Sequence, residues 1–174
     1  MGNLERFKID LKALQGDGET FEFDIQDSFF QDTDTSIVKG GCLKTQLRVL
    51  KTSGVYELLF DTKGYAVVPC DICLDDMRQD IDVQDRVIAK LGDLPSTDDI
   101  VVVPEDEGIL DVTWLIYESI ALAIPTRHVH EEGACNKEML ERIRQLTRQE
   151  ENSEEQAVDP RWSKLEKLKS TIKE

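Results

Sequence analysis

The sequence is poor in cysteine, histidine and aromatic residues. Its 174 residues include four cysteines and two histidines, and aromatic residues account for 6% of the chain. Four cysteines in a chain of this length are too few for a disulfide scaffold. Residues 1–6 contain no apolar core of the kind that a secretory signal peptide needs. We therefore expect a cytoplasmic protein.

Positive charge is also scarce. The chain has 21 lysine and arginine residues against 36 aspartate and glutamate residues, a formal net charge of -15. Such a charge opposes general attraction to nucleic acid phosphates. Basic and aromatic residues are not interleaved on any expected strand, as an RNA-binding sheet would require. We expect any contact with RNA to be local or to be made through a basic protein partner.

Several motifs of enzymes and membrane proteins are missing. The sequence contains no phosphate-binding glycine loop, no nucleotide-binding fingerprint and no nucleophile elbow. The most apolar helix candidate, residues 111–124, is shorter than the roughly 20 residues needed to cross a bilayer. The sequence therefore predicts neither an enzyme nor a membrane protein, and it indicates no small-molecule substrate.

Alternating apolar and polar residues dominate the first half of the chain, a pattern typical of half-buried β-strands. The first two strands are expected at residues 4–13 and 20–25, as a hairpin or as neighbours at a sheet edge. The next two, 37–50 and 55–68, flank a turn at 51–54, and Gly64 permits a bend or bulge in the second of them.

A further strand is expected after Asp76, with a short one at Ile100–Val103 inside the loop that follows. Asp111 is expected to cap a helix that reaches about Ile124 and covers the open face of the sheet. A second helix is predicted from Asn136 to about Arg148. The fold class is therefore α+β: a curved antiparallel β-sheet packed by a central apolar helix, with barrel-like closure as an alternative and a helical C-terminal tail.

The C-terminal region divides by composition. We expect a single α+β domain over residues 1–148, an acidic linker over 149–158 and an amphipathic helix over 159–174. Asp159 and Pro160 are typical of a helix start. An isolated helix this short is marginal in water, so it must dock on its own domain or on a partner. Its apolar side chains, Trp162, Leu165 and Leu168, are the candidate partner-binding residues.

Cys70 and Cys73 form the motif around which the chain is organised. A Cys-x-x-Cys knuckle can point two thiolates at one cation, and the flanking strands place this one at the tip of a hairpin. A thioredoxin-like redox role is disfavoured, because it would need the first cysteine at a helix N-terminus. The motif therefore predicts half of a metal site.

The other half is suggested by His128, His130 and Cys135. Cysteine and histidine donors suit a structural zinc ion in a closed tetrahedral shell. The preferred shell is Cys70, Cys73, His130 and Cys135, with His128 as the alternative histidine. Four protein ligands would leave no coordination position for a water molecule, which disfavours hydrolysis by the metal.

The order of these features resembles the YceD family. The features that carry the resemblance follow one another in this order: a strand entering Cys-x-x-Cys, the 111–124 helix ending in Ala-Ile-Pro, then His130 and Cys135, and finally Asp159-Pro160-Arg161-Trp162 with Leu165 and Leu168. The resemblance extends from about Ile37 to the C-terminus. It implies a bacterial, cytoplasmic ribosome biogenesis factor needed for accumulation of 23S rRNA, with no enzymatic activity.

The expected direct partner is a basic protein, either a large-subunit ribosomal protein or an assembly factor, because the chain is strongly acidic. One alternative is a metal-dependent hydrolase or nuclease acting on pre-rRNA, with Glu118 or Glu131 as the base. Another is a thiol sensor that releases zinc on oxidation.

Overall fold

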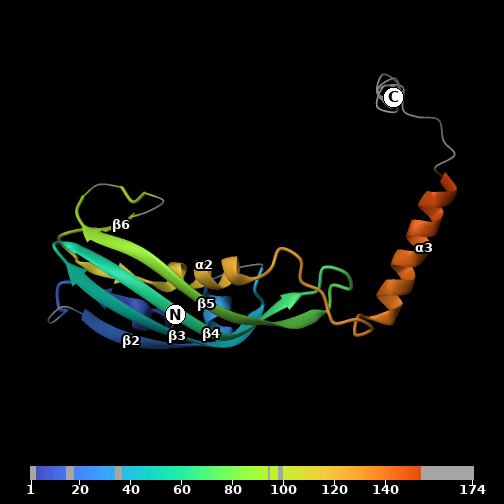
Figure 1. The fold of residues 1–174 in the computed structure, drawn as a ribbon, viewed down its shortest axis with the longest axis horizontal. Helices are drawn as coiled ribbons and strands as arrows, with labels where there is room; N and C mark the ends of the chain where they lie inside the picture. The colour runs from blue at the N-terminus through green and yellow to red at the C-terminus, as the bar shows by residue number, and fades with distance from the viewer. Residues whose placement is uncertain (1–2, 15–17, 34–36, 94, 98–99, 154–174) are drawn as a thin grey trace, which may run out of the picture.

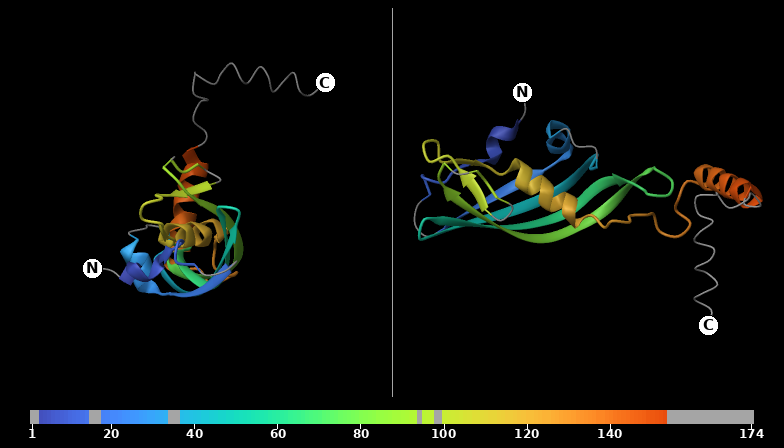
Figure 2. Two further views of the ribbon diagram at one scale, coloured as in Figure 1. Left: turned by 90° about the vertical axis from the view of Figure 1, so that its left-hand side faces the viewer. Right: turned by 90° about the horizontal axis from the view of Figure 1, so that it is seen from above.

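The computed structural model describes residues 3–14, 18–33, 37–93, 95–97 and 100–153, and these form an α+β fold (Figure 1). A long twisted sheet carries a helix on one face, and a second helix lies beyond one end of the sheet (Figures 1 and 2). The elements in chain order are a 3-10 helix η1 (Asn3–Phe7), β1 (Lys8–Asp10), β2 (Gly18–Ile25), α1 (Asp27–Asp32), β3 (Gly40–Thr52), β4 (Val55–Pro69), β5 (Asp76–Leu91), β6 (Ile100–Val103), β7 (Ile109–Asp111), α2 (Thr113–Ala123) and α3 (Lys137–Ser153).

The main sheet has the strand order β2-β3-β4-β5-β6. Its first three pairings are antiparallel, but β6 runs parallel to β5, with Ile88 opposite Ile100. The predicted antiparallel sheet is therefore confirmed for three of its four pairings, and β6 is the exception at one edge. The sheet curves around α2 (Figure 2) and stays open, with β2 and β6 at its edges, so the barrel-like alternative does not occur in the described residues.

The expected first strand forms along only part of its length. Phe7, Ile9 and Leu11 are buried as the alternation predicted, but residues 3–7 form the 3-10 helix. β1 pairs with β7 rather than with β2, so the predicted hairpin was wrong. β7 spans three residues before the chain turns into α2, which limits the length over which β1 can find a partner.

The β4–β5 hairpin is the longest feature of the sheet and leads directly to the cysteine motif. Its register is continuous from Val55 opposite Lys90 to Pro69 opposite Asp76. Gly64 therefore forms no bulge. A Cβ atom at this position would lie 2.2 Å from the backbone oxygen of Cys42 on β3, so only glycine allows the two strands to approach this closely.

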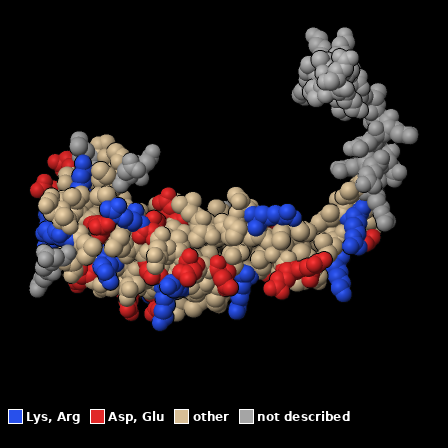
Figure 3. Space-filling view, in the orientation of Figure 1, with Lys and Arg blue, Asp and Glu red and all other residues tan. Residues whose placement is uncertain are grey.

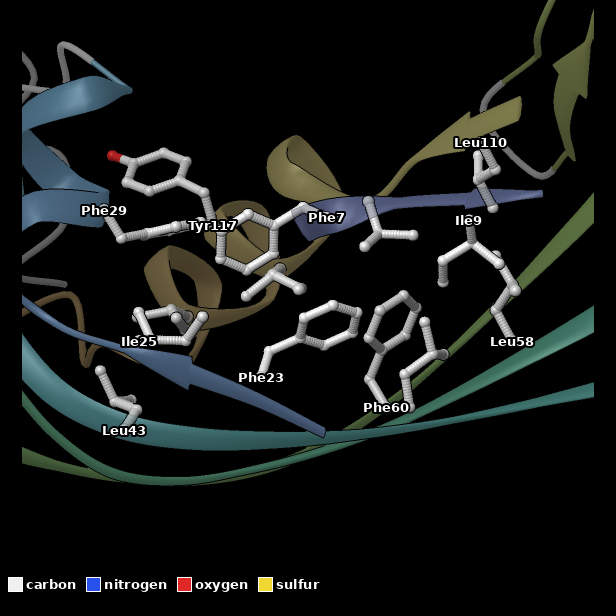
Figure 4. Packing of buried hydrophobic residues seen from close by; sticks show 14 of the residues in the cluster. Phe7, Ile9, Phe23, Ile25, Phe29, Leu43, Leu58, Phe60, Leu110 and Tyr117 are labelled. Carbon is white, nitrogen blue, oxygen red and sulfur yellow. The ribbon is translucent and has the colours of Figure 1, made fainter. Parts of the chain in front are cut away.

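Helix α2 covers the concave face of the sheet and completes the core, as predicted. Its inward side chains Ile116, Tyr117 and Ile120 are buried. Phe7 and Phe23 stack above the sheet with ring centroids 5.2 Å apart (Figure 4). Asp111 precedes the helix by two residues, and its Oδ1 accepts a hydrogen bond from the backbone N–H of Thr113 at 2.9 Å.

Helix α3 begins where it was predicted but extends further. It continues to Ser153, five residues beyond the expected end at Arg148 and into the stretch expected to be the linker. The predicted C-terminal helix and its residues Trp162, Leu165 and Leu168 lie outside the described residues. Within the described part of the chain, no helix has both the length and the apolarity to cross a membrane.

Candidate metal centre

The cysteine knuckle is a tight turn that closes the β4–β5 hairpin. The backbone N–H of Cys70 donates to the oxygen of Asp75, and that of Leu74 donates to the oxygen of Cys70, both at 2.9 Å. Leu74 takes a positive φ of 62°, which lets the chain reverse within these few residues. The N–H of Ile72 points to the Cys70 Sγ at 3.5 Å. The turn therefore directs the first thiol inward and supplies it with a hydrogen-bond donor.

The segment after α2 is attached to this knuckle through Asp71 and His128. The Asp71 N–H donates to the backbone oxygen of His128 at 3.0 Å. In return, the His128 N–H donates to the Asp71 Oδ2 at 2.7 Å. The two segments are 57 residues apart in sequence, and these reciprocal hydrogen bonds fix them side by side.

Four side chains converge beside this contact: Cys70, Cys73, His130 and Cys135. One donor atom from each lies within 4.8 Å of all the others. The Sγ atoms of Cys70 and Cys135 are 3.9 Å apart, and the His130 Nδ1 is 3.3 Å from the Cys73 Sγ and 4.0 Å from the Cys135 Sγ. All three thiols are free. The structure thus brings together the four residues of the preferred shell.

The separations fit one tetrahedral zinc ion. With Zn–S bonds of about 2.3 Å and a Zn–N bond of about 2.0 Å, tetrahedral geometry places two sulfurs ~3.8 Å apart and a sulfur and a nitrogen ~3.5 Å apart. The Cys70–Cys135 sulfur distance of 3.9 Å is close to the first value, the two His130 distances of 3.3 and 4.0 Å bracket the second, and every donor pair lies within 4.8 Å. Three thiols and one imidazole are also the donors that zinc prefers over magnesium or calcium. The cluster can therefore bind a metal, and its chemistry suits zinc.

The environment separates the pKa values of two of the thiols. Burial acts to raise the pKa of Cys70, but hydrogen bonds from the backbone N–H groups of Cys73, His130 and Ile72 outweigh it and lower the value to about 6. Burial, together with hydrogen bonds and charge from Cys70 and Cys73, raises the pKa of Cys135 to about 11. The lowered pKa favours the thiolate form of Cys70, whereas Cys135 must lose a proton to become a ligand.

His128, the alternative ligand, lies outside the four-residue cluster. Its Nδ1 lies 3.0 Å from the backbone oxygen of Pro125, and its Nε2 lies 3.6 Å from the Asp71 Oδ1. Both ring nitrogens therefore face oxygen atoms. This arrangement leaves His130 as the histidine whose ring reaches the thiols.

Asn136 fixes the start of α3 against the knuckle. Its Oδ1 accepts hydrogen bonds from the backbone N–H groups of Glu138 and Met139 at 3.0 and 3.3 Å, and so caps the helix. Its Nδ2 donates to the Asp75 Oδ2 at 3.0 Å. Because Asn136 directly follows Cys135, the candidate metal centre and the base of α3 form one unit.

Sequence reasoning missed the supporting roles of Asp71, Asp75 and Asn136. The capping role of Asn136 was readable, because an asparagine stood at the predicted helix start. The contacts of Asp71 and Asp75 were not readable, because each joins residues about 60 positions apart. Of the two candidate catalytic carboxylates, both Glu118 on α2 and Glu131 after the histidine segment are exposed.

Two hollows of about 410 and 480 Å³ lie away from the cluster. Both are on the outer face of the sheet, on either side of Gln46 and Asp61, and neither is lined by a cysteine or histidine. The structure therefore places the metal-ligating chemistry at the hairpin tip, away from these two hollows.

The sequence also matches one protein family. The family described as large ribosomal RNA subunit accumulation protein YceD matches residues 58–169, which is more than half of the chain and includes all four cluster residues. The match starts later than the Ile37 boundary expected from the motifs. No curated protein and no solved structure matches the chain. By the extent of this match, the chain belongs to the YceD family, whose name connects it with accumulation of the large-subunit ribosomal RNA.

Proposed function

We propose that this chain supports accumulation of 23S rRNA in the bacterial cytoplasm as a non-enzymatic interaction module stabilised by one structural zinc ion. The family name supports the pathway. The convergence of Cys70, Cys73, His130 and Cys135 within 4.8 Å is the observation that carries the proposed role of the metal. Zinc would join the tip of the β4–β5 hairpin to the segment that leads into α3.

A structural role agrees better with this donor set than a catalytic one. Four protein donors complete a tetrahedral shell, and catalytic zinc sites keep one position for water or substrate. The hydrolase or nuclease alternative also requires a metal-bound water for its base to activate, and a complete shell of protein donors leaves no position for that water. Its candidate bases, Glu118 and Glu131, are both exposed. In this proposal the chain acts by binding a partner and not by catalysing a reaction.

A thiol sensor is the second candidate, and one observation favours it. The Cys70 Sγ lies 3.9 Å from that of Cys135, and the lowered pKa of Cys70 favours its thiolate form. A two-electron oxidant such as hydrogen peroxide would convert the two thiols to a disulfide and release the metal. Slow alkylation of Cys70 in the zinc-loaded chain and fast alkylation after chelation would favour the locked structural site instead.

The direct partner in this proposal is a basic protein of the large subunit or one of its assembly factors. The net charge of -15 favours such a partner over bare RNA. The sequence of the C-terminal segment supplies one candidate contact through Trp162, Leu165 and Leu168. Recovery of bare rRNA without any protein in a pull-down would contradict this choice of partner.

Elemental analysis tests the metal centre. Protein purified without chelator should contain about one zinc per chain. The metal should be lost in both Cys70→Ser and Cys135→Ser. Cys42→Ser is the matched control, because Cys42 is an exposed free cysteine on β3 outside the cluster. Zinc that survives Cys135→Ser would show that the two distant segments do not share one site.

The ratio of 23S to 16S rRNA tests the pathway. In a bacterial strain that lacks the chain, the ratio should fall and be restored by the wild type and by Cys42→Ser. Poor restoration by Cys70→Ser at equal protein level would connect the metal centre to the function. An unchanged ratio in the deletion strain would reject the proposed role.

A further inference from the structure

The outward side of α2 exposes two large apolar side chains. Trp114 and Leu122 are 59% and 77% exposed, whereas Ile116 and Ile120 on the inward side are fully buried. Glu118 is also exposed and lies between them, one helical turn from each. From above, α2 lies in front of the sheet and no other element covers it in this view (Figure 2). We call Trp114, Glu118 and Leu122 the α2 stripe.

The Trp114 ring packs against a buried neighbour, although more than half of its side chain is exposed. Its ring centroid lies 5.3 Å from that of Tyr117, with the planes inclined at 38°, and Tyr117 is itself only 5% exposed. An aromatic side chain already supported by a buried neighbour loses little conformational entropy when a partner covers it. Tryptophan is also enriched among the residues that dominate binding energy in interfaces. Trp114 therefore has the properties of a preorganised anchor.

The segment around the α2 stripe is strongly acidic. Residues 104–132 carry one exposed basic side chain, Arg127, and seven exposed acidic ones: Glu105, Asp106, Glu107, Asp111, Glu118, Glu131 and Glu132. Lys8 and Lys12 lie close to residues 106–111 of this segment. On the outer face of the sheet charges of both signs also pair, as Lys44 does with Asp24 and Arg86 with Glu57. Figure 3 shows such mixing of charges along the length of the molecule. The exposed apolar side chains of the α2 stripe therefore lie in a segment of the sequence with an excess of acidic residues, among which Glu118 belongs to the stripe itself.

We infer that the α2 stripe is the docking surface for a basic, amphipathic segment of a partner protein. An arginine or lysine of that segment would lie over the Trp114 ring and pair with Glu118, and an apolar side chain would cover Leu122. This inference deepens the proposed function by naming the surface that receives the basic partner.

Two other occupants fit the stripe less well. A second copy of the chain would bring together two acidic surfaces of a protein with net charge -15. The chain's own C-terminal residues 161–173 are basic in sequence, and α3, the last described element before them, lies beyond one end of the sheet (Figures 1 and 2). A basic partner protein would meet the acidic surface with charge of the opposite sign, and it is therefore the occupant that we infer.

Site-specific photo-crosslinking in living cells tests the inference. A benzophenone amino acid is placed at Leu122 in the full chain, and the crosslinked products are identified by mass spectrometry. The matched control carries it at Leu146, which is 61% exposed on α3. We expect a basic protein crosslinked from position 122 and not from 146. Introducing Glu118→Lys should reduce its yield about 10-fold, whereas Glu22→Lys on the outer sheet face should not.

Each other outcome would overturn the inference. A crosslinked dimer would identify a second copy as the occupant, and an internal crosslink to residues 161–173 would identify the C-terminal segment. An equal yield from positions 122 and 146, or no product from position 122, would show that the stripe is not an interface. A crosslinked basic partner unrelated to the ribosome would support the α2 stripe as a docking surface but contradict the proposed function. A lowered 23S rRNA level in the deletion strain, without this crosslink, would support the proposed function but contradict the docking surface.

Discussion

The sheet body and the cysteine end of the molecule are stabilised by different interactions. In the body, Leu47, Leu58 and Ile116 are fully buried in one continuous apolar core. At the cysteine end, the contacts between distant segments are polar: Asp71 with His128, Asn136 with Asp75, and the thiols with His130. Apolar burial suffices to hold the body, whereas the cysteine end lacks such a core and depends on its ligands.

This difference predicts which part of the molecule a bound metal would stabilise. Polar contacts that remain partly exposed contribute little to stability by themselves. A zinc ion bound by four side chains contributes its binding free energy to the folding of whatever the ligands hold together. Metal binding should therefore stabilise the knuckle, the histidine segment and the base of α3, and leave the sheet body nearly unchanged.

The largest effect is expected from a truncation in the body. Phe7 is 1% exposed and contacts the rings of Phe23 and Phe29. Phe7→Ala should lower the free energy of unfolding by about 3–5 kcal/mol, because it removes apolar contacts and leaves a cavity. Urea denaturation followed by circular dichroism measures this change. A loss below about 1 kcal/mol would show that the core is not continuous at this position.

Removal of the metal should affect the other region. Chelation under reducing conditions should speed amide hydrogen exchange several-fold over residues 125–147 and leave β3 and β4 protected, because the body has its own core. Hydrogen exchange with mass spectrometry resolves the two regions, and Cys42→Ser should respond like the wild type. Equal loss of protection in both regions would remove the distinction between them.

Asp71→Ala should weaken the cysteine end without removing a ligand. The Asp71 carboxylate accepts the N–H of His128 and so positions the segment that carries His130. Loss of such a supporting contact typically lowers metal affinity by about 10–100-fold. Competition with a chromophoric chelator measures the affinity. Asp82→Ala, which removes an exposed carboxylate on β5, is the control and should bind zinc like the wild type.

The pH dependence of zinc affinity should change slope near pH 6. Above that value Cys70 is already a thiolate, and below it zinc must displace the Cys70 proton, so affinity falls by a further factor of about 10 per pH unit. Cys135, with its pKa raised to about 11, adds a release of one proton at every pH below that value. Chelator competition between pH 5 and 8 measures the slope. A constant slope across pH 6 would contradict the lowered pKa of Cys70.

Much of the body could be predicted because it depends on local periodicity. The alternation from Val55 to Val68 and the apolar helix before Pro125 each identified an element and the side it buries. The errors arose where pairing depends on distant segments. β1 pairs with β7, about a hundred residues away, and β6 adds in parallel to β5, and neither partner is specified by the local pattern.

The sequence by itself determined the donor types, the acidic charge and the hairpin that carries Cys70 and Cys73, because these are properties of composition and short-range order. Only the tertiary structure decided that His130 and not His128 faces the thiols, and that Trp114 and Leu122 stay exposed on a helix apolar on nearly all sides. These outcomes depend on how a curved sheet brings segments some 60 residues apart into contact and covers one side of α2. That geometry arises only when the whole core packs together.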